Sequence, residues 1–161
     1  MHLKSFLVEE EKNNFDKSVL RAYLKCPISV MKADIWRYCI IYKYGGIYAD
    51  ADTVCMIDPR IFLKNNSKLV CVPECWNKFM CQWVFAAPAG SPILKEIIDL
   101  VVKRVNNIKV VRGKHIIHYL TGPSVFTDGI IQYLQKQGKP IFTKNKIRNT
   151  IQYTNYPHDD L

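Results

Sequence analysis

KADIWRYCIIYKYGGIYADADT, residues 32–53, is the stretch of the chain with the strongest structural signal. Its apolar spacing predicts a helix over residues 30–44, which Ser29 can cap. Apolar residues occupy nearly every face of this helix, so we expect it to be deeply buried. Gly45 stands where a left-handed C-terminal helix cap falls. The residues that follow read as a strand that breaks at two aspartates, Asp50 and Asp52.

These two aspartates are one residue apart, and side chains at i and i+2 of an extended segment point the same way. Asp50 and Asp52 would then present two like charges that repel each other on one side. A divalent cation removes the repulsion, and carboxylates suit Mg²⁺ or Mn²⁺ while leaving coordination positions for a diphosphate. The alternative is a strand-end turn with exposed acids. A calcium loop is excluded, because Val54, Cys55 and Ile61 replace its oxygen ligand, glycine and glutamate.

Two charged residues, Asp34 and Arg37, lie inside the apolar helix, three positions apart on one face. One reading is an ordinary helix ion pair. However, an exposed pair is hard to place on so apolar a helix, and a buried pair is seldom kept for stability alone. If the helix ends at the same cleft as Asp50, the pair can instead hold sugar hydroxyls, because Asp accepts hydrogen bonds and Arg donates several.

Shorter patterns along the rest of the chain predict helices that alternate with strands, which indicates an α/β domain. A length of 161 residues with 48% hydrophobic residues suits one domain with one core. Cys26-Pro27 and Gly138 end predicted helices, and Ser91-Pro92 begins one. The further predicted helices span 15–25, 91–105 and 125–137, and the strands 47–57, 69–74 and 82–88, with one or two more within 141–157.

The net charge of +9 is unevenly distributed. Residues 1–100 carry 13 Lys and Arg against 11 Asp and Glu, a balance of +2, and residues 101–161 carry 10 against 3, a balance of +7. This basic part can face phosphates or an anionic membrane, or it is a solvated surface. No nucleic-acid-binding motif accompanies it, so no nucleic acid is expected. The absence of a secretory signal and of a membrane-spanning run predicts a cytoplasmic protein, with peripheral membrane contact as an option.

Cysteine and histidine patterns give no separate metal site. The six cysteines form no CxxC pair, which favours reduced and mostly buried thiols. Zinc binding by Cys71, Cys75 and Cys81 is disfavoured by their spacing and by the lack of a nearby His. His115 and His118 have no acidic or Cys partner close in sequence, so we expect a structural role. The three tryptophans are expected in the core or in a pocket wall.

Read together, residues 32–53 closely resemble the sugar-binding region of DXD glycosyltransferases. That family includes fungal initiating α-1,6-mannosyltransferases, bacterial capsule and polysaccharide transferases, and the catalytic domain of large glucosylating toxins. The pattern is an apolar residue and D-x-x-R, an apolar helix, Y-G-G-x-Y and then D-x-D. Weaker likeness continues through residues 79–94 and 119–130. Every central element is present, at Asp34, Arg37, Tyr44-Gly45-Gly46, Tyr48 and Asp50/Asp52.

The resemblance implies a GT-A-like fold, with a Rossmann-like mixed sheet flanked by helices, in a single domain over residues 1–161. Its donor and metal core would lie at about 28–60. It also implies Mn²⁺ or Mg²⁺ as cofactor and a UDP- or GDP-sugar as donor. By motif, Asp52 would be the direct metal ligand, and Asp50 would contact the donor's ribose and sugar and reach the metal through water. The implied donor site further includes Asp34 and Arg37 on the transferred sugar, together with Gly45, Gly46, Tyr48 and Gln82.

The implied activity is metal-dependent transfer of a hexosyl group to a glycan, lipid or protein acceptor, with retention. Asp50 and Asp52 would be its catalytic residues. Two departures from the family stand out: the strand P-x-I-I-H-Q-x-W and the later Ser-Trp are absent, and Gln82 stands where Asn is common. We therefore expect a fold that is truncated or minimal at both ends. The alternative is a non-catalytic or partner-dependent fragment of a transferase that binds nucleotide sugars.

Overall fold

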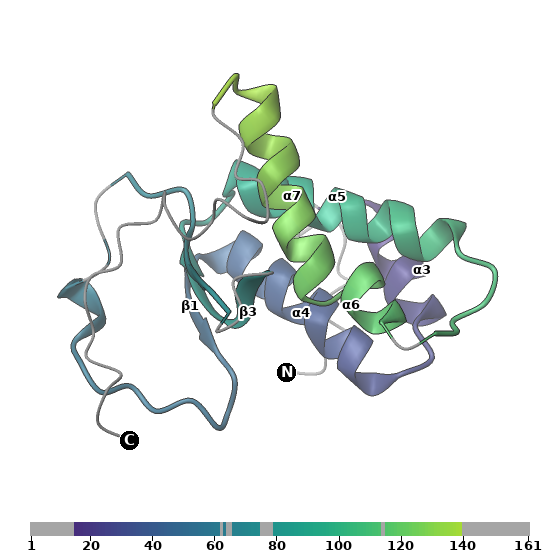
Figure 1. The fold of residues 1–161 in the computed structure, drawn as a ribbon, viewed down its shortest axis with the longest axis horizontal. Helices are drawn as coiled ribbons and strands as arrows, with labels where there is room; N and C mark the ends of the chain where they lie inside the picture. The colour runs from purple at the N-terminus through teal and green to yellow at the C-terminus, as the bar shows by residue number, and fades with distance from the viewer. Residues whose placement is uncertain (1–14, 62, 64–65, 75–78, 114, 140–161) are drawn as a thin grey trace.

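The computed structural model describes residues 15–61, 63, 66–74, 79–113 and 115–139 (Figure 1). Helices and strands are mixed along the chain, so the predicted α/β class is confirmed. In Figure 1 the helices lie together beside a small sheet, and the segment between β1 and β2 loops away from them. The elements are α3 (Lys17–Lys25), α4 (Ser29–Tyr44), β1 (Gly46–Ala49), the 3-10 turn η1 (Pro59–Ile61), β2 (Val70–Pro73), β3 (Met80–Ala87), α5 (Pro92–Asn107), α6 (Ile116–Leu120) and α7 (Pro123–Lys136).

The described strands form one three-stranded sheet in the order β1-β3-β2. Both pairings are antiparallel, and Phe85 of β3 stands opposite Tyr48 of β1 and Cys71 of β2. A mixed sheet was expected, but within the described residues the sheet is wholly antiparallel. The register puts Tyr48 and Phe85 side by side under the helices, with their ring centroids 5.7 Å apart.

Helix α4 lies at the centre of the core, as its apolar faces predict. Met31, Tyr38 and Cys39 on this helix are fully buried. The Tyr38 ring stacks on Phe126 of α7, with centroids 5.7 Å apart and an interplanar angle of 16°, and it also contacts Phe85 of β3. One side chain of α4 thus joins the sheet to α7, and the helix that carries the sequence motif is also the helix around which the core packs.

Of the two predicted helix caps, one differs from the structure and one is confirmed. Ser29 was expected to cap α4, but it is the first helical residue, and Ile28 occupies the cap position with no side-chain hydrogen bond. The helix starts early because the Ile28 carbonyl accepts from the backbone N–H groups of Met31 and Lys32. By contrast, the predicted cap of α5 is confirmed, since Ser91 Oγ accepts from the Leu94 N–H.

The C-terminal half contains one helix that the spacing did not predict, the five-residue α6. Helix α7 begins two residues earlier than predicted, with Pro123 in its first turn. Gly138 has a φ of 63° and follows the end of α7, as expected. The strands predicted within 141–157 lie outside the described residues. Within the described part of the chain, no helix combines the length and the apolar character needed to cross a membrane.

Gly45 joins α4 to β1 with the positive φ expected of a left-handed cap, but its ψ of −174° lies outside the left-handed helical region. Its φ is 69°, and its N–H donates to the Ile41 carbonyl at 2.8 Å, which closes the last turn of α4. A Cβ at this position would lie 2.7 Å from the Ala89 backbone nitrogen, closer than carbon and nitrogen can approach. Glycine is therefore required twice here, for its dihedral angle and for the close approach of the chain after β3.

Substitution of Gly45 by alanine should show both requirements. Gly45→Ala is expected to lower the free energy of unfolding by about 2–4 kcal/mol, because a strained φ and a backbone clash add. Gly90→Ala is the matched control, since Gly90 has a φ of 68° but open space around its missing Cβ. It should cost only about 1–2 kcal/mol. Urea unfolding of both variants measures the difference, and equal losses would contradict the close approach at Gly45.

Candidate donor-binding site

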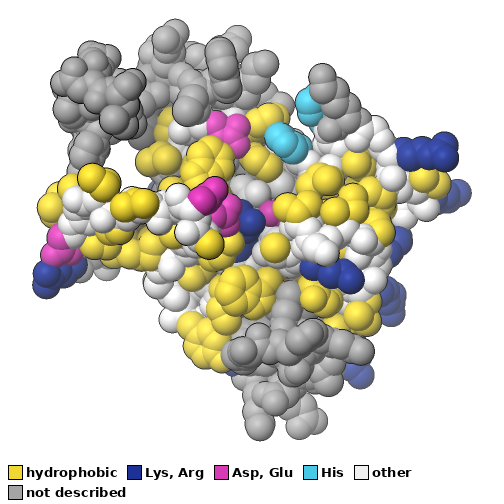
Figure 2. Space-filling view, turned by 90° about the horizontal axis from the view of Figure 1, so that it is seen from below, with side chains coloured by type: hydrophobic (Ala, Val, Ile, Leu, Met, Phe, Trp, Pro, Cys, Tyr) yellow, Lys and Arg dark blue, Asp and Glu magenta, His cyan; other side chains and the backbone are white. Residues whose placement is uncertain are grey.

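The DxD segment lies immediately after β1 and borders an open hollow of about 490 Å³. Asp50, Asp52, Thr53 and Trp83 line this hollow. Figure 2 shows acidic and basic side chains meeting near the middle of this part of the surface, with hydrophobic side chains around them. Trp83 is 38% exposed, so it forms a wall of the hollow, one of the two places expected for it.

The backbone turns at the two aspartates, which changes how their side chains were expected to point. The Asp50 N–H still pairs with the Trp83 carbonyl at 2.8 Å, which extends the ladder by one residue beyond β1. The Thr53 N–H then donates to the Asp50 carbonyl at 2.9 Å and closes a four-residue turn. The i, i+2 alternation of a strand therefore does not apply to Asp50 and Asp52, although both face the same hollow.

Arg37 connects the buried carboxylate of Asp34 to the carboxylate of Asp50. Its Nη2 lies 3.3 Å from Asp34 Oδ1 and 3.5 Å from Asp50 Oδ1. The side chains of Arg37 and Asp34 are only 6% and 2% exposed, whereas that of Asp50 is 34% exposed. The structure thus brings together three residues that the sequence singled out. Their ion pairs form a continuous connection from the buried Asp34 to Asp50 at the hollow.

Tyr48 supports this arrangement from β1. Its hydroxyl donates to Asp50 Oδ1 at 2.6 Å, and the Arg37 guanidinium lies over its ring with the carbon 4.8 Å from the centroid. Burial and the hydrogen bond to Asp50 raise the pKa of the Tyr48 phenol to about 12. Tyr48 therefore stays protonated and holds one oxygen of Asp50, which orients the exposed part of that carboxylate toward the hollow.

Gln82 on β3 belongs to the same network. Its side-chain Nε2 donates to Asp34 Oδ1 at 3.1 Å, and its backbone carbonyl accepts from Arg37 Nη1 at 3.1 Å. The Tyr38 hydroxyl lies 2.9 Å from Gln82 Oε1 and 2.8 Å from the Thr121 carbonyl, both within donating distance. Gln82 therefore contacts Asp34 and Arg37 of α4 directly, which its position in the sequence alone did not indicate.

Thr121 is the residue that sequence reasoning missed. It is fully buried between α6 and α7, and its Oγ1 donates to Asp34 Oδ2 at 2.8 Å. The sequence contained one weak signal, because Thr121 begins the Thr-Gly-Pro segment that resembles a later family element. Nothing in the spacing connects it to Asp34, which lies 87 positions away.

The Asp34 carboxylate is buried, so water does not solvate its charge. Burial raises the pKa of its carboxyl above the ordinary value, while the hydrogen bonds from Thr121 and Gln82 and the Arg37 charge oppose the rise. The Arg37 Nε is also buried and has no hydrogen-bond partner among the described residues. A buried donor without an acceptor is rare in native proteins. This orphaned donor is consistent with a site that awaits a further polar group.

The chemistry of the DxD segment fits a cation that shares its ligands with a substrate. Among the described residues, no three His, Cys, Asp or Glu side chains gather into a protein-only metal site. Asp50 and Asp52 supply hard carboxylate oxygens at an open hollow, and Mg²⁺ is usually held by one or two carboxylates plus substrate phosphates and water. Two carboxylates at an open surface match that pattern better than a closed structural site.

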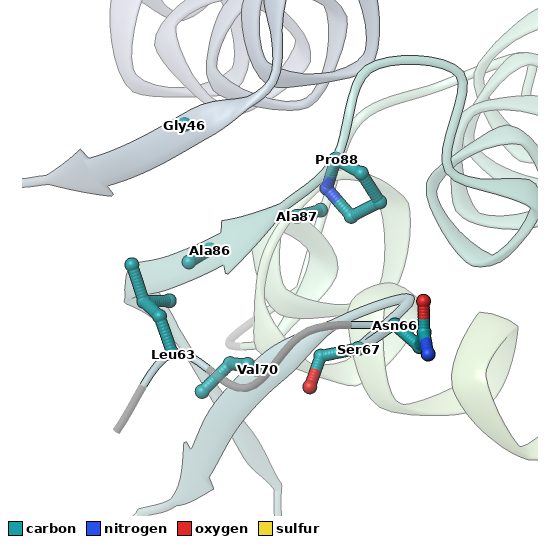
Figure 3. A pocket seen from close by; sticks show the side chains of 8 residues that line it. All are labelled: Gly46, Leu63, Asn66, Ser67, Val70, Ala86, Ala87 and Pro88. Atoms are coloured by element: carbon teal, nitrogen blue, oxygen red, sulfur yellow. The ribbon is translucent and has the colours of Figure 1, made fainter. Parts of the chain in front are cut away.

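Gly45 and Gly46 are not in this hollow. Gly46 lines a second hollow of about 240 Å³, with Leu63, Asn66, Ser67, Val70 and three residues of the β3 end (Figure 3). Figure 3 shows these residues coming from β1, from the end of β3 and from the segment that leads into β2. The structure therefore separates the two glycines from Asp50 and Asp52 and assigns Gly45 a role in the chain turn.

The other His and Cys candidates lie outside the first hollow where the structure describes them. The His118 ring packs against Phe79 and His115, with centroids 6.1 and 5.9 Å apart. Among the described cysteines, Cys26, Cys39 and Cys81 are buried, and all are free thiols. Burial raises the pKa of Cys26 to about 11 and that of Cys71 to about 12. Cys75, Trp76 and the basic segment beyond residue 139 lie outside the described residues.

A glycosyltransferase is the class that this arrangement indicates, and comparison with known proteins agrees with it. Residues 3–68 match the family described as "Glycosyltransferase sugar-binding region containing DXD motif". Residues 3–68 therefore match the sugar-binding region of DXD glycosyltransferases, and the resemblance read from the sequence is confirmed.

The names of three relatives agree with this match. The chain is 30% identical over 163 aligned positions to the initiation-specific alpha-1,6-mannosyltransferase of Schizosaccharomyces pombe, which covers 88% of this chain and 41% of that protein. It is 32% identical over 166 positions to the enzyme of the same name from Candida albicans, covering 83% and 43%. It is 50% identical over 142 positions to the uncharacterized glycosyltransferase L373 of Acanthamoeba polyphaga mimivirus, covering 87% and 50%. The chain thus spans half or less of the length of these relatives.

A solved structure supports the fold. The PaToxG glycosyltransferase superposes with a TM-score of 0.50 at 21% identity, over 75% of this chain and 50% of that one. At this identity the likeness concerns the fold alone, and it confirms the glycosyltransferase-like architecture predicted from the sequence.

The buried network makes a prediction about stability. Tyr38→Phe should lower the free energy of unfolding by about 1–3 kcal/mol, because Gln82 Oε1 and the Thr121 carbonyl lose their shared buried donor. Tyr42→Phe is the control, because Tyr42 lies on the same helix and is only partly buried. It should cost about 0.5 kcal/mol or less. Urea unfolding measures both, and an unchanged Tyr38→Phe variant would show that the network contributes nothing to stability.

Proposed function

We propose that this chain is, or forms the core of, a metal-dependent glycosyltransferase that moves a hexosyl group from a nucleotide sugar to a glycan, lipid or protein acceptor. The observation that carries the proposal is the Asp34–Arg37–Asp50 connection. It places a buried, hydrogen-bonded ion pair directly behind a half-exposed carboxylate at an open hollow. A buried pair of this kind costs desolvation, so its retention at the edge of a hollow favours a role in binding.

Asp52 and Asp50 are the residues that would hold a divalent cation, Mn²⁺ or Mg²⁺. Asp52 is the more exposed of the two and is proposed as the direct ligand, with Asp50 nearer the donor. When bound, the cation would neutralise charge on the departing diphosphate. Tyr48 supports this role from the protein side, because its hydroxyl occupies one oxygen of Asp50 and leaves the other available.

Arg37 and Asp34 are proposed to hold the transferred sugar. The orphaned Nε of Arg37 supports this proposal, because a sugar hydroxyl is an acceptor of the right kind for it. Trp83, at the wall of the hollow, offers a flat apolar surface on which a base or sugar face can stack. No carboxylate is assigned as a nucleophile, so the proposed retention would use attack of the acceptor hydroxyl on the face that the diphosphate leaves.

Mannose is the first sugar to test, because two of the relatives named above are mannosyltransferases. UDP and GDP both remain candidates for the nucleotide. An alternative function is a partner-dependent or non-catalytic module that binds a nucleotide sugar. The chain covers 41–50% of the length of the three relatives. This alternative predicts donor binding without hydrolysis or transfer until the rest of a transferase is supplied.

Isothermal titration with UDP and GDP, each with and without Mn²⁺, tests the proposal. One nucleotide should bind only when Mn²⁺ is present. In Asp52→Asn, adding Mn²⁺ should no longer increase the affinity for that nucleotide. Removing a partner from outside the first coordination shell already costs about 10–100-fold in metal affinity, so loss of a direct ligand should cost at least as much.

Asp99→Asn is the charge-matched control, because Asp99 lies on the exposed side of α5 and, within the described residues, forms an ion pair with Lys95 alone. It should bind like the unaltered chain. Metal-independent binding that Asp52→Asn leaves unchanged would rule out the proposed metal site. Binding without turnover of the donor would favour the partner-dependent module.

A further inference from the structure

The segment between α6 and α7 places the buried hydroxyl of Thr121 against Asp34 of the candidate donor site. The backbone N–H groups of Thr121 and Gly122 both donate to the Ile117 carbonyl, at 3.0 and 2.9 Å, which ends α6 in a tight turn. A Cβ at Gly122 would lie 3.0 Å from His118 Cα and 3.2 Å from the Ile117 oxygen. Pro123 then starts α7 at once. Together these residues hold the Thr121 side chain facing α4.

The Thr121 hydroxyl has one proton and a clear choice of acceptor. Its Oγ1 lies 2.8 Å from Asp34 Oδ2 and 3.5 Å from the Ile117 carbonyl oxygen. A short bond to a carboxylate is stronger than a long bond to a neutral carbonyl. The proton therefore goes to Asp34, and this bond crosses from the α6–α7 segment to the helix that carries the DxxR pair.

The acceptor positions of Asp34 are almost filled. Oδ1 accepts from Gln82 Nε2 at 3.1 Å and lies 3.3 Å from Arg37 Nη2, while Oδ2 accepts from Thr121. A carboxylate offers about four lone-pair positions. Within the described part of the chain one position is left, and it is on Oδ2, the oxygen whose direction Thr121 sets.

We propose that Thr121 is a positioning residue for the sugar end of the donor site. By holding Oδ2, it fixes the rotation of the Asp34 carboxylate, and through the ion pair it fixes the guanidinium of Arg37 beside Asp50. The proposal rests on the proposed function, because it assigns the sugar of the donor to the Asp34–Arg37 side and the diphosphate to the Asp50–Asp52 side. It predicts that Thr121 affects recognition of the sugar and not of the nucleoside diphosphate.

Thr127 supplies a matched control on the neighbouring helix. Thr127 is also buried. Its Oγ1 donates to the Pro123 carbonyl at 2.7 Å and accepts from the Met80 N–H at 2.7 Å. These bonds join α7 to β3 without contacting Asp34 or Arg37. Thr127→Val should therefore destabilise the fold while it leaves the relative affinity for sugar-bearing and sugar-free nucleotides unchanged.

The experiment compares Thr121→Val, Thr121→Ser and Thr127→Val in the full chain. Binding of the nucleoside diphosphate that the unaltered chain prefers and of the corresponding nucleotide mannose is measured with Mn²⁺. Thr121→Val should weaken nucleotide-sugar binding about tenfold relative to the diphosphate, because a hydrogen bond to a buried charge is lost. Thr121→Ser should restore the ratio. An unchanged ratio in Thr121→Val, or an equal change in Thr127→Val, would overturn the proposal.

A second readout needs no ligand. The Nε–Hε signal of Arg37 in ¹H–¹⁵N spectra should move in Thr121→Val and stay near its original position in Thr121→Ser and Thr127→Val. If the unaltered chain bound neither nucleotide, the proposed function would fail, and the Arg37 signal would still decide whether Thr121 positions the pair. A signal that is the same in all variants would refute the positioning role.

Discussion

The ion pair between Asp34 and Arg37 is the interaction on which the rest of the structure depends. Both side chains are almost completely buried, so their charges have lost the water that would otherwise stabilise them. Removing one member of such a pair costs about 3–5 kcal/mol, because the other charge is left uncompensated. Hydrogen bonds from β3 and from the α6–α7 segment offset this cost: Gln82 and Thr121 donate to Asp34, and the Gln82 carbonyl accepts from Arg37. These contacts connect α4 to the sheet and to the α6–α7 segment.

The same pair also connects the core to the surface. Arg37 lies between a fully desolvated carboxylate and a half-exposed one, and the Tyr48 ring beneath it limits where its guanidinium can lie. Electrostatic forces are strong in such a poorly hydrated place and weaken toward the open hollow. Asp50 is therefore held firmly by protein groups on its inner side and remains free on its outer side, an arrangement suited to a substrate that arrives with its own charge.

Local features were predictable because they depend on neighbours in the chain. The burial of α4, the positive φ at Gly45, the break of β1 at the aspartates and the cap of α5 all follow from residues within a few positions. Ser29 shows the limit of this reasoning, because a serine can either cap a helix or be its first residue. Here it is the first residue, since the Ile28 carbonyl accepts the first helical hydrogen bonds. Helix α6 was missed because five residues are too few for a periodic pattern.

The sequence by itself determined which residues matter most: the D-x-x-R and D-x-D motifs and the glycine between helix and strand, because their spacing has a direct chemical meaning. Only the tertiary structure decided what holds them. Thr121 and Gln82 reach Asp34 from 87 and 48 positions away, and Gly46 turns out to face a different hollow from Asp52. A hydrogen bond acts over about 3 Å. The packing of the helices and the sheet determines which groups come within that distance, so a local sequence pattern cannot predict these partners.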